Sequence, residues 1–291
     1  MINELFSFYK PLIENRIDEL LPETKAPYNE VIKAARYSLK LGGKRIRPII
    51  IMEFCRLFGG KIESALDFSI ALEMIHTYSL IHDDLPCMDN DDFRRGKPSC
   101  HKAFSEDIAL LAGDALLTEA FSVCSNAAVE DGVRLKAVNI LSKMSGFYGM
   151  LGGQVIDLSF VKNTPDLNSL CEMYNLKTGC LLRAAAVIGS TVGGADENDI
   201  NNADIFASKV GLAFQIIDDI LDVTADPELL GKPVGSDDKN QKTTFVTLLG
   251  LNGAKEVANK LTNEALEILD RFNGNTENLK LITNYLLQRN F

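Results

Sequence analysis

Apolar residues recur along most of the chain at the three- and four-residue spacing of amphipathic helices, and the alternation typical of strands is scarce. Glycine and proline interrupt this pattern at intervals close to the length of a helix. The pattern predicts helices over residues 3–20, 28–41, 47–58, 63–85, 105–128, 132–150, 153–160, 166–189, 198–223, 242–249, 253–271 and 276–288. Because no proline- or serine-rich linker and no internal repeat divides them, we expect one all-α domain over residues 1–291, with long central helices surrounded by shorter ones.

The composition supports a packed protein, since 46% of the residues are hydrophobic. The net charge of -10 argues against nonspecific binding of nucleic acid, which requires a positively charged surface. The six cysteines form no CxxC pair and are expected to be reduced. The N-terminus shows no signal-peptide pattern, and no stretch approaches the ~20 apolar residues of a membrane helix. We therefore expect a soluble, cytoplasmic protein without membrane insertion.

A first cluster of aspartates, Asp83, Asp84 and Asp89, begins at the C-terminal end of the predicted helix 63–85. The helix dipole disfavours carboxylates at this end, so local stability does not explain them. Pro86 breaks the helix, and a loop after it could bring Asp89 back beside the other two. An acidic helix end that is merely solvated remains the alternative for the cluster taken alone.

The cluster is followed closely by cations, among them Arg94 and Arg95. Two carboxylates about 4 Å apart repel by roughly 4 kcal/mol at an effective dielectric near 20, so such a cluster favours a shared cation. Ligation by oxygen alone points to Mg²⁺, which completes its shell with water and phosphate. Guanidinium groups beside the metal would bind a diphosphate.

A second cluster lies in the helical segment 211–222, where Gln215, Asp218 or Asp219, and Asp222 share one face. Such a polar stripe is normally the solvent side of an amphipathic helix. Here, however, the stripe contains no lysine or glutamate. The two clusters together suggest an enzyme that depends on Mg²⁺ and acts on a diphosphate.

Basic residues also surround a glycine pair at 42–48, where Lys44, Arg45 and Arg47 stand at a helix N-terminus that favours anions. A surface capping motif is the alternative. His76 shares a helix with the first aspartates, and a lone histidine there is more often a packed core residue. No zinc spacing, GxGxxG, GxxxxGK[ST] or GxSxG motif is present.

These residues resemble the motifs of all-trans (E-type) short-chain prenyl diphosphate synthases of the bacterial and plastid type, and among them farnesyl diphosphate synthases most. The matching segments are GGKRIRP at 42–48, EMIHTYSLIHDDLPCMDNDDFRRGKP at 73–98, LAGDALL at 111–117, GGQVIDL at 152–158, KTG at 177–179, FQIIDDILD at 214–222 and GKPVGSDDKNQKTTF at 231–245. The resemblance implies an isoprenoid-synthase-type helical bundle around a deep central cavity, usually a homodimer. Every motif is intact, which argues against a non-catalytic synthase subunit.

The resemblance also implies the metal and substrate sites. The implied metal ligands are Asp83, Asp84 and Asp89 in the first motif and Asp218, Asp219 and Asp222 in the second, with three Mg²⁺ ions when substrate is bound and Mn²⁺ as a substitute. The implied ligands of the allylic substrate are Arg94, Lys177, Thr178, Gln215 and Lys232. The implied ligands of isopentenyl diphosphate are Lys44, Arg45, Arg47, His76 and Arg95. The implied catalytic residues are Asp83, Asp84, Asp89, Arg94, Lys177 and Asp218.

The implied reaction is the head-to-tail condensation of isopentenyl diphosphate with dimethylallyl or geranyl diphosphate. Metal and cations stabilise the charge on the departing diphosphate, which is also the expected base. Apolar helix walls would keep water from the allylic cation. A terpene cyclase shares the aspartate-rich helix but uses one substrate, and the second anion site around Lys44, Arg47 and His76 argues against it.

Three residues on the helix before Asp83 are expected to set product length. Ser79 and Ile75 lie one and two turns before Asp83 on the same side, and Tyr78 lies about 7.5 Å away along the axis at 1.5 Å per residue. The tyrosine ring is large enough to form a floor, although it could instead only pack between helices. We expect (2E,6E)-farnesyl diphosphate as the main product, with some of the twenty-carbon product because Ser79 is small. A geranylgeranyl diphosphate synthase is the alternative.

Overall fold

The computed structural model describes residues 1–160, 163–224 and 242–287. The predicted ligand Lys232 therefore lies outside the described residues. Contacts divide the chain into two compact units, which are described separately. Unit 1 comprises residues 3–139 and 191–194, and unit 2 comprises residues 140–190 and those from 195 onward. A single domain over 1–291 stays a prediction.

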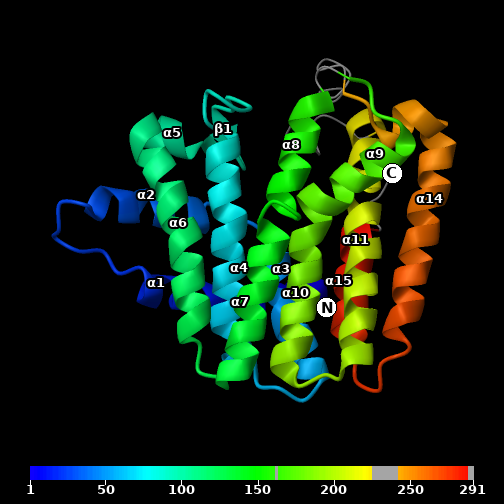
Figure 1. The fold of residues 1–291 in the computed structure, drawn as a ribbon, viewed down its shortest axis with the longest axis horizontal. Helices are drawn as coiled ribbons and strands as arrows, with labels where there is room; N and C mark the ends of the chain where they lie inside the picture. The colour runs from blue at the N-terminus through cyan, green and yellow to red at the C-terminus, as the bar shows by residue number, and fades with distance from the viewer. Residues whose placement is uncertain (161–162, 225–241, 288–291) are drawn as a thin grey trace. The chain divides into compact units, whose positions relative to one another are not determined.

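Unit 1 is built on a central helix, α4, which lies beside α6 and also packs against α3 (Figure 1). Side chains are buried on every side of α4, as expected for a core helix that is apolar all round. The helices of this unit are α1 (Ile2–Leu20), α2 (Asn29–Lys40), α3 (Ile46–Leu57), α4 (Ile62–Asp83), α5 (Cys100–Ala103), α6 (Glu106–Asn126) and most of α7 (Asp131–Ser145).

Unit 2 is built on α11, which packs along α14 (Figure 1) and against the segment η1. Its elements are α8 (Met150–Phe160), α9 (Leu167–Tyr174), the π-helical turn η1 (Asn175–Gly179), most of α10 (Cys180–Gly193), α11 (Glu197–Thr224), α14 (Phe245–Leu269) and α15 (Glu277–Leu287). The described residues confirm the all-α class, and the predicted helices recur with ends shifted by a few residues.

Two of the predicted helical segments contain a local feature of their own. The helix expected over 166–189 contains a π-helical turn of five residues, which joins α9 to α10. In such a turn the backbone hydrogen bonds join residues five apart instead of four. The helices expected over 242–249 and 253–271 lie within the element α14 as two helical segments, and they meet at a kink where Gly250 has the non-helical backbone angles φ 71° and ψ 165°. The predicted break between the two helices is therefore confirmed, and glycine permits this positive φ at little steric cost.

A short hairpin in unit 1 was not predicted. Strand β1 (Phe93–Arg94) pairs antiparallel with β2 (Lys97–Pro98), and the two-residue turn between them has positive φ at Arg95 and Gly96. Two-residue hairpins favour such backbone angles because they match the twist of the strands. Since each strand has only two residues, the alternation that identifies strands could not be seen in the sequence.

One described helix, α6, is long and apolar enough to cross a membrane by length and composition alone. This corrects the expectation that no stretch approaches that length. Helix α6 packs against α4 and α2. A core helix of a soluble protein meets the same criterion, so α6 is weak evidence for a membrane span.

Candidate active site

The first aspartate motif closes α4. Asp83 is the last residue of the helix and Asp84 is its C-cap. The backbone amide of Asp89 donates to the carbonyl oxygen of Asp83 at 2.9 Å. The loop after Pro86 therefore turns back on the helix end, as the sequence predicted, and returns Asp89 to the first two aspartates.

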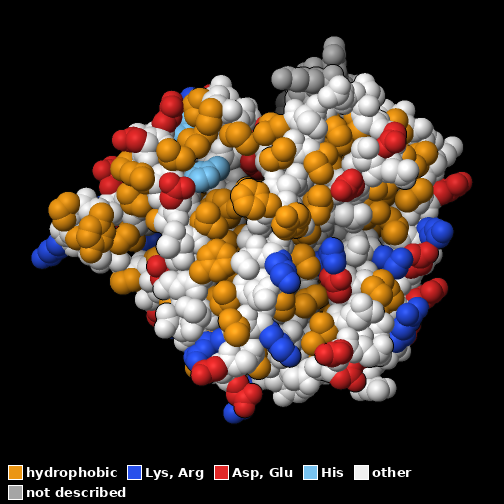
Figure 2. Space-filling model, in the orientation of Figure 1, with side chains coloured by type: hydrophobic (Ala, Val, Ile, Leu, Met, Phe, Trp, Pro, Cys, Tyr) orange, Lys and Arg blue, Asp and Glu red, His pale blue; other side chains and the backbone are white. Residues whose placement is uncertain are grey.

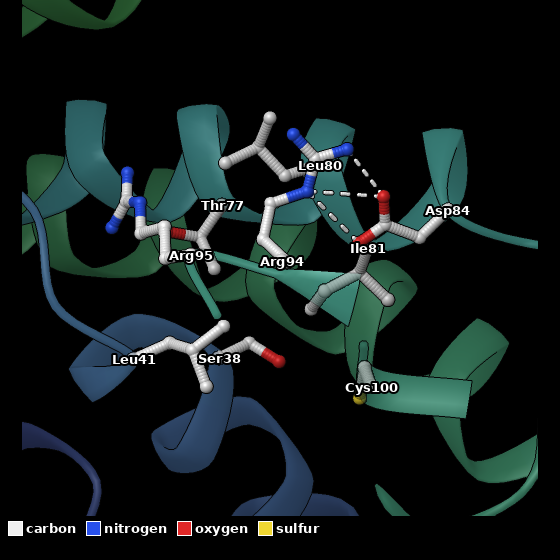
Figure 3. A pocket seen from close by; sticks show the side chains of 9 residues that line it. All are labelled: Ser38, Leu41, Thr77, Leu80, Ile81, Asp84, Arg94, Arg95 and Cys100. Atoms are coloured by element: carbon white, nitrogen blue, oxygen red, sulfur yellow. Dashed lines mark hydrogen bonds and ion pairs between the residues drawn. The ribbon is translucent and has the colours of Figure 1, made fainter. Parts of the chain in front are cut away.

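Arg94 of the hairpin is paired with Asp84 of this motif. The Nε of Arg94 donates to the two carboxylate oxygens of Asp84 at 3.0 and 3.1 Å, and its Nη2 also donates to Oδ1 (Figure 3). Asp84 is only 2% exposed. Burial raises the pKa of Asp84 above its ordinary value, and the Arg94 guanidinium opposes this shift. An aspartate expected to bind metal and an arginine expected to bind phosphate are therefore in direct contact.

The neighbouring Arg95 points elsewhere. Its Nη1 donates to the carbonyl oxygen of Gly42, and its guanidinium lies against Gly43, where a side chain would collide with it. The two adjacent arginines thus serve two different groups, the aspartate motif and the basic glycine turn. They also line a small pocket formed by Ser38, Leu41, Thr77, Leu80, Ile81, Asp84, Arg94, Arg95 and Cys100 (Figure 3).

The basic turn at 42–48 contains one residue that differs from its expected role. Arg45 is buried, and its guanidinium donates to Glu73 Oε1 at 2.8 Å and to the carbonyl oxygen of Leu39. These contacts favour a structural role over the predicted contact with substrate. Arg47, by contrast, has a buried Nε without a hydrogen-bond partner in the described structure.

His76 lies in the field of these arginines. Burial, followed by the charges of Arg47 and Arg95, holds the pKa of His76 well below its ordinary value. Its imidazole is therefore neutral near pH 7. A neutral imidazole can donate one hydrogen bond to a phosphate oxygen without adding charge.

The second aspartate motif, on α11, has two differently placed parts. Asp219 is 7% exposed, and its carboxylate accepts from Tyr174 Oη at 2.8 and 2.9 Å and from the backbone amide of Phe245 at 2.9 Å. It thus joins α9, α11 and the start of α14. Asp218 and Asp222, one helical turn apart, are partly exposed. The open choice between Asp218 and Asp219 for the accessible stripe is thereby resolved in favour of Asp218.

The π-helical turn carries two predicted ligands of the allylic substrate. Lys177 Nζ donates to Asp157 Oδ2 at 2.6 Å, and Thr178 Oγ1 donates to Gln215 Oε1 at 2.6 Å. Thr178 and Gln215 are therefore brought together as expected. Asp157 was missed as a site residue, although it lies in the segment GGQVIDL that was singled out at 152–158.

Gly153 allows the close approach of α8 to the π-helical turn. A Cβ at this position would lie 2.6 Å from Lys177 Cα and 2.8 Å from the carbonyl carbon of Leu176. Both sides of the contact are backbone, so neither can move cheaply. We expect Gly153→Ala to lower stability by about 1–3 kcal/mol, as overpacking does, and to raise the KM for the allylic substrate by displacing Lys177.

Thermal unfolding and steady-state kinetics would measure both effects. Gly132→Ala on α7 is the control, because nothing lies within 4 Å of a Cβ there. If Gly153→Ala leaves the melting temperature and the kinetics unchanged, the contact does not constrain the turn.

The donor set fits the expected metal chemically. The aspartates of both motifs offer only carboxylate oxygens, which suit Mg²⁺, and this ion typically takes one or two carboxylates and keeps several waters. Among the described residues, no group of three or more His, Cys, Asp or Glu side chains is already gathered around a metal position. The individual ligand assignments therefore stay predictions.

Comparisons with known proteins identify the class. A model of the polyprenyl synthetase family matches residues 29–286, so the chain belongs to that family. It is therefore a prenyl diphosphate synthase, a prenyltransferase of isoprenoid synthesis, with the expected all-α isoprenoid-synthase fold.

Two curated relatives make different products. The chain is 42% identical to the farnesyl diphosphate synthase of Micrococcus luteus over 290 residues, covering 100% of both chains. It is 43% identical to geranylgeranyl pyrophosphate synthase 4 of Arabidopsis thaliana over 282 residues, covering 96% of this chain and 75% of that one. The crystal structure of an FPP/GFPP synthase from Zymomonas mobilis matches with a TM-score of 0.90 and 37% identity, covering 98% of each chain.

Proposed function

We propose that this protein condenses isopentenyl diphosphate head-to-tail with dimethylallyl and geranyl diphosphate, giving mainly (2E,6E)-farnesyl diphosphate and diphosphate. The observation that carries this proposal is the divergence of Arg94 and Arg95. One guanidinium contacts the aspartate motif and the other contacts the basic glycine turn. Two anion-binding groups side by side suit a reaction between two diphosphates.

The proposed mechanism assigns each group a task. Bound Mg²⁺ would supply charge neutralisation for the leaving diphosphate. In the first motif the ligands would be Asp83, Asp84 and Asp89, and in the second they would be Asp218 and Asp222, with Asp219 fixing the second motif. Arg94, Lys177, Thr178, Gln215 and Lys232 would orient the allylic diphosphate, and Lys44, Arg47, His76 and Arg95 would bind isopentenyl diphosphate. The departing diphosphate takes the proton, so no protein base is required.

Incubating the purified protein with isopentenyl diphosphate and each allylic diphosphate in turn, with and without Mg²⁺, tests the proposal. Sizing the products separates the alternatives. A fifteen-carbon main product supports it, whereas a twenty-carbon main product identifies a geranylgeranyl diphosphate synthase. Consumption of an allylic diphosphate alone would identify a cyclase, and no turnover would identify a non-catalytic subunit.

We also propose a cytoplasmic homodimer. Apolar side chains on and just before α8 support it, including Phe147 and Tyr148, which is 91% exposed. Figure 2 shows hydrophobic side chains on the surface over α8. Exposed apolar groups that gather on one helix commonly mark an interface between proteins. Sedimentation of the purified protein would measure the oligomeric state.

The proposed fifteen-carbon limit rests on Tyr78. Its side chain is buried, its ring meets His82 edge-on at 5.7 Å between centroids, and its hydroxyl has no hydrogen-bond partner among the described residues. Burial raises the pKa of Tyr78 to about 12, so the phenol is neutral. Ile75 is fully buried and Ser79 is half-buried. Of the three side chains expected to limit product length, that of Tyr78 is the largest.

We expect Tyr78→Ala to lengthen the main product from fifteen to twenty carbons, because removing the ring opens space beside the growing tail. Chromatography of the dephosphorylated products measures the shift. Tyr78→Phe is the control, since it keeps the ring and should keep the product. A folded, active Tyr78→Ala enzyme with the original product distribution would place the floor elsewhere.

A further inference from the structure

A buried carboxylate lies among the arginines of unit 1. Glu73 on α4 is 4% exposed and accepts from Arg45 Nη1 at 2.8 Å. The Arg45 side chain is equally buried, so the pair is taken out of water on both sides. Buried ion pairs form only with good geometry and further hydrogen bonds, and the Leu39 carbonyl supplies one such bond to Arg45.

This pair fixes the backbone of the basic turn. Arg45 caps the N-terminus of α3 in the left-handed conformation, with φ 54°. A residue other than glycine adopts this conformation only where its surroundings hold it. The guanidinium ties Arg45 to the last turn of α2 through Leu39 and to α4 through Glu73. Lys44 and Arg47 stand on either side of Arg45 in the sequence, so we expect their positions to depend on this arrangement.

Glu73 also acts on the neighbouring charges. Burial lowers the pKa of Arg47 and of Arg95, and the negative charge of Glu73 raises both. The carboxylate thus offsets part of the free energy that is lost when these charged arginines are buried close together. The charged groups facing it are Arg45, Arg47 and Arg95.

We propose that Glu73 is a positioning residue for the binding of isopentenyl diphosphate, acting through Arg45 on the basic turn. The inference rests on the proposed function of that turn. The proposal predicts in which direction the affinity for isopentenyl diphosphate changes when Glu73 is removed. If Glu73 mattered only as a charge, removing it would make the site more positive and tighten the binding of a diphosphate. If Glu73 positions the turn, removing it weakens that binding.

The test is Glu73→Gln, which keeps the shape and removes the charge. Steady-state kinetics should show the KM for isopentenyl diphosphate raised about tenfold, the expected result of misplacing one charge-assisted contact. The KM for geranyl diphosphate should stay within about twofold of the original. An unchanged or lowered KM for isopentenyl diphosphate in the folded variant overturns the proposal.

Glu53→Gln is the matched control. Glu53 is equally buried, accepts from Tyr9 Oη at 2.6 Å and pairs with Arg56, away from the basic turn. It should lose stability like Glu73→Gln without the selective change in KM. If both variants change the same KM alike, Glu73 has only a general structural role and the proposal fails.

A double variant covers the case in which Glu73→Gln fails to fold because Arg45 is left as an unpaired buried charge. Arg45→Met with Glu73→Leu removes both charges at similar volume, which buried ion pairs tolerate. It should fold and still bind isopentenyl diphosphate more weakly, measured by calorimetry without an allylic partner. Tight binding in the double variant overturns the proposal. If the unaltered protein binds isopentenyl diphosphate without turning it over, the proposed function fails, but the binding of the variants can still be compared with that of the unaltered protein. If the unaltered protein does not bind isopentenyl diphosphate, the proposed function and the proposed role of Glu73 both fail.

Discussion

Replacing Asp83 or Asp218 with alanine is expected to lower turnover by several orders of magnitude while leaving the fold intact. Both residues are partly exposed, so neither carboxylate is buried in the core. Each would contribute to stabilising the charge that develops on the leaving diphosphate, and such electrostatic stabilisation is commonly the largest catalytic contribution. The measurements are kcat at saturating Mg²⁺ and both substrates, and the far-UV circular dichroism of each variant.

Carboxylates on the same two helices are the controls for this prediction. Asp67 on α4 pairs with Arg16, and Asp204 on α11 pairs with Arg183, each at 2.7 Å. Their alanine variants should keep near-normal turnover. Near-normal rates in Asp83→Ala or Asp218→Ala would instead show that the two motifs do not act together.

Arg47→Ala is expected to raise the KM for isopentenyl diphosphate by roughly tenfold to more than a hundredfold. A charge-assisted contact contributes about 1.5–3 kcal/mol, and every 1.4 kcal/mol corresponds to about tenfold in affinity. Arg47 belongs to the basic turn, which Arg95 also contacts, whereas Arg94 pairs with Asp84. The KM for the allylic substrate should therefore change little.

Arg56→Ala provides the comparison on the same helix, since Arg56 pairs with Glu53 and is exposed. Steady-state kinetics with each substrate varied in turn would measure both constants. A rise confined to the KM of the allylic substrate would mean that the two substrate sites are assigned the wrong way round.

Helical periodicity predicted most of the fold because burial against neighbouring helices imposes it. The apolar segment expected over 63–85 is α4 (Ile62–Asp83), and the segment expected over 198–223 is α11 (Glu197–Thr224). The π-helical turn at Asn175–Gly179 could not be predicted, because its residues fit an ordinary helical pattern equally well. The hairpin at Phe93–Pro98 was too short to show a period.

The aspartate motifs could be located from the sequence, but the partners of their members could not. Asp218 and Asp219 are adjacent, and only the positions of Tyr174 and Phe245 show which of them faces inward. Glu73 and Asp157 were not recognised because a single acidic residue in a helix is usually solvated. Their importance depends on cations that come from distant parts of the chain, Arg45 and Lys177.

The π-helical turn has a consequence for how this stretch of chain can change. A π turn holds about one residue more than an α turn, and one residue corresponds to about 100° of rotation in a helix. Deleting one of residues 175–179 would therefore leave an ordinary α turn and would keep α9 and α10 in phase with each other. The side chains inside the turn would change direction, however, and the contacts of Lys177 with Asp157 and of Thr178 with Gln215 both start there. The extra residue thus changes where the side chains of this turn point without turning the helices on either side of it.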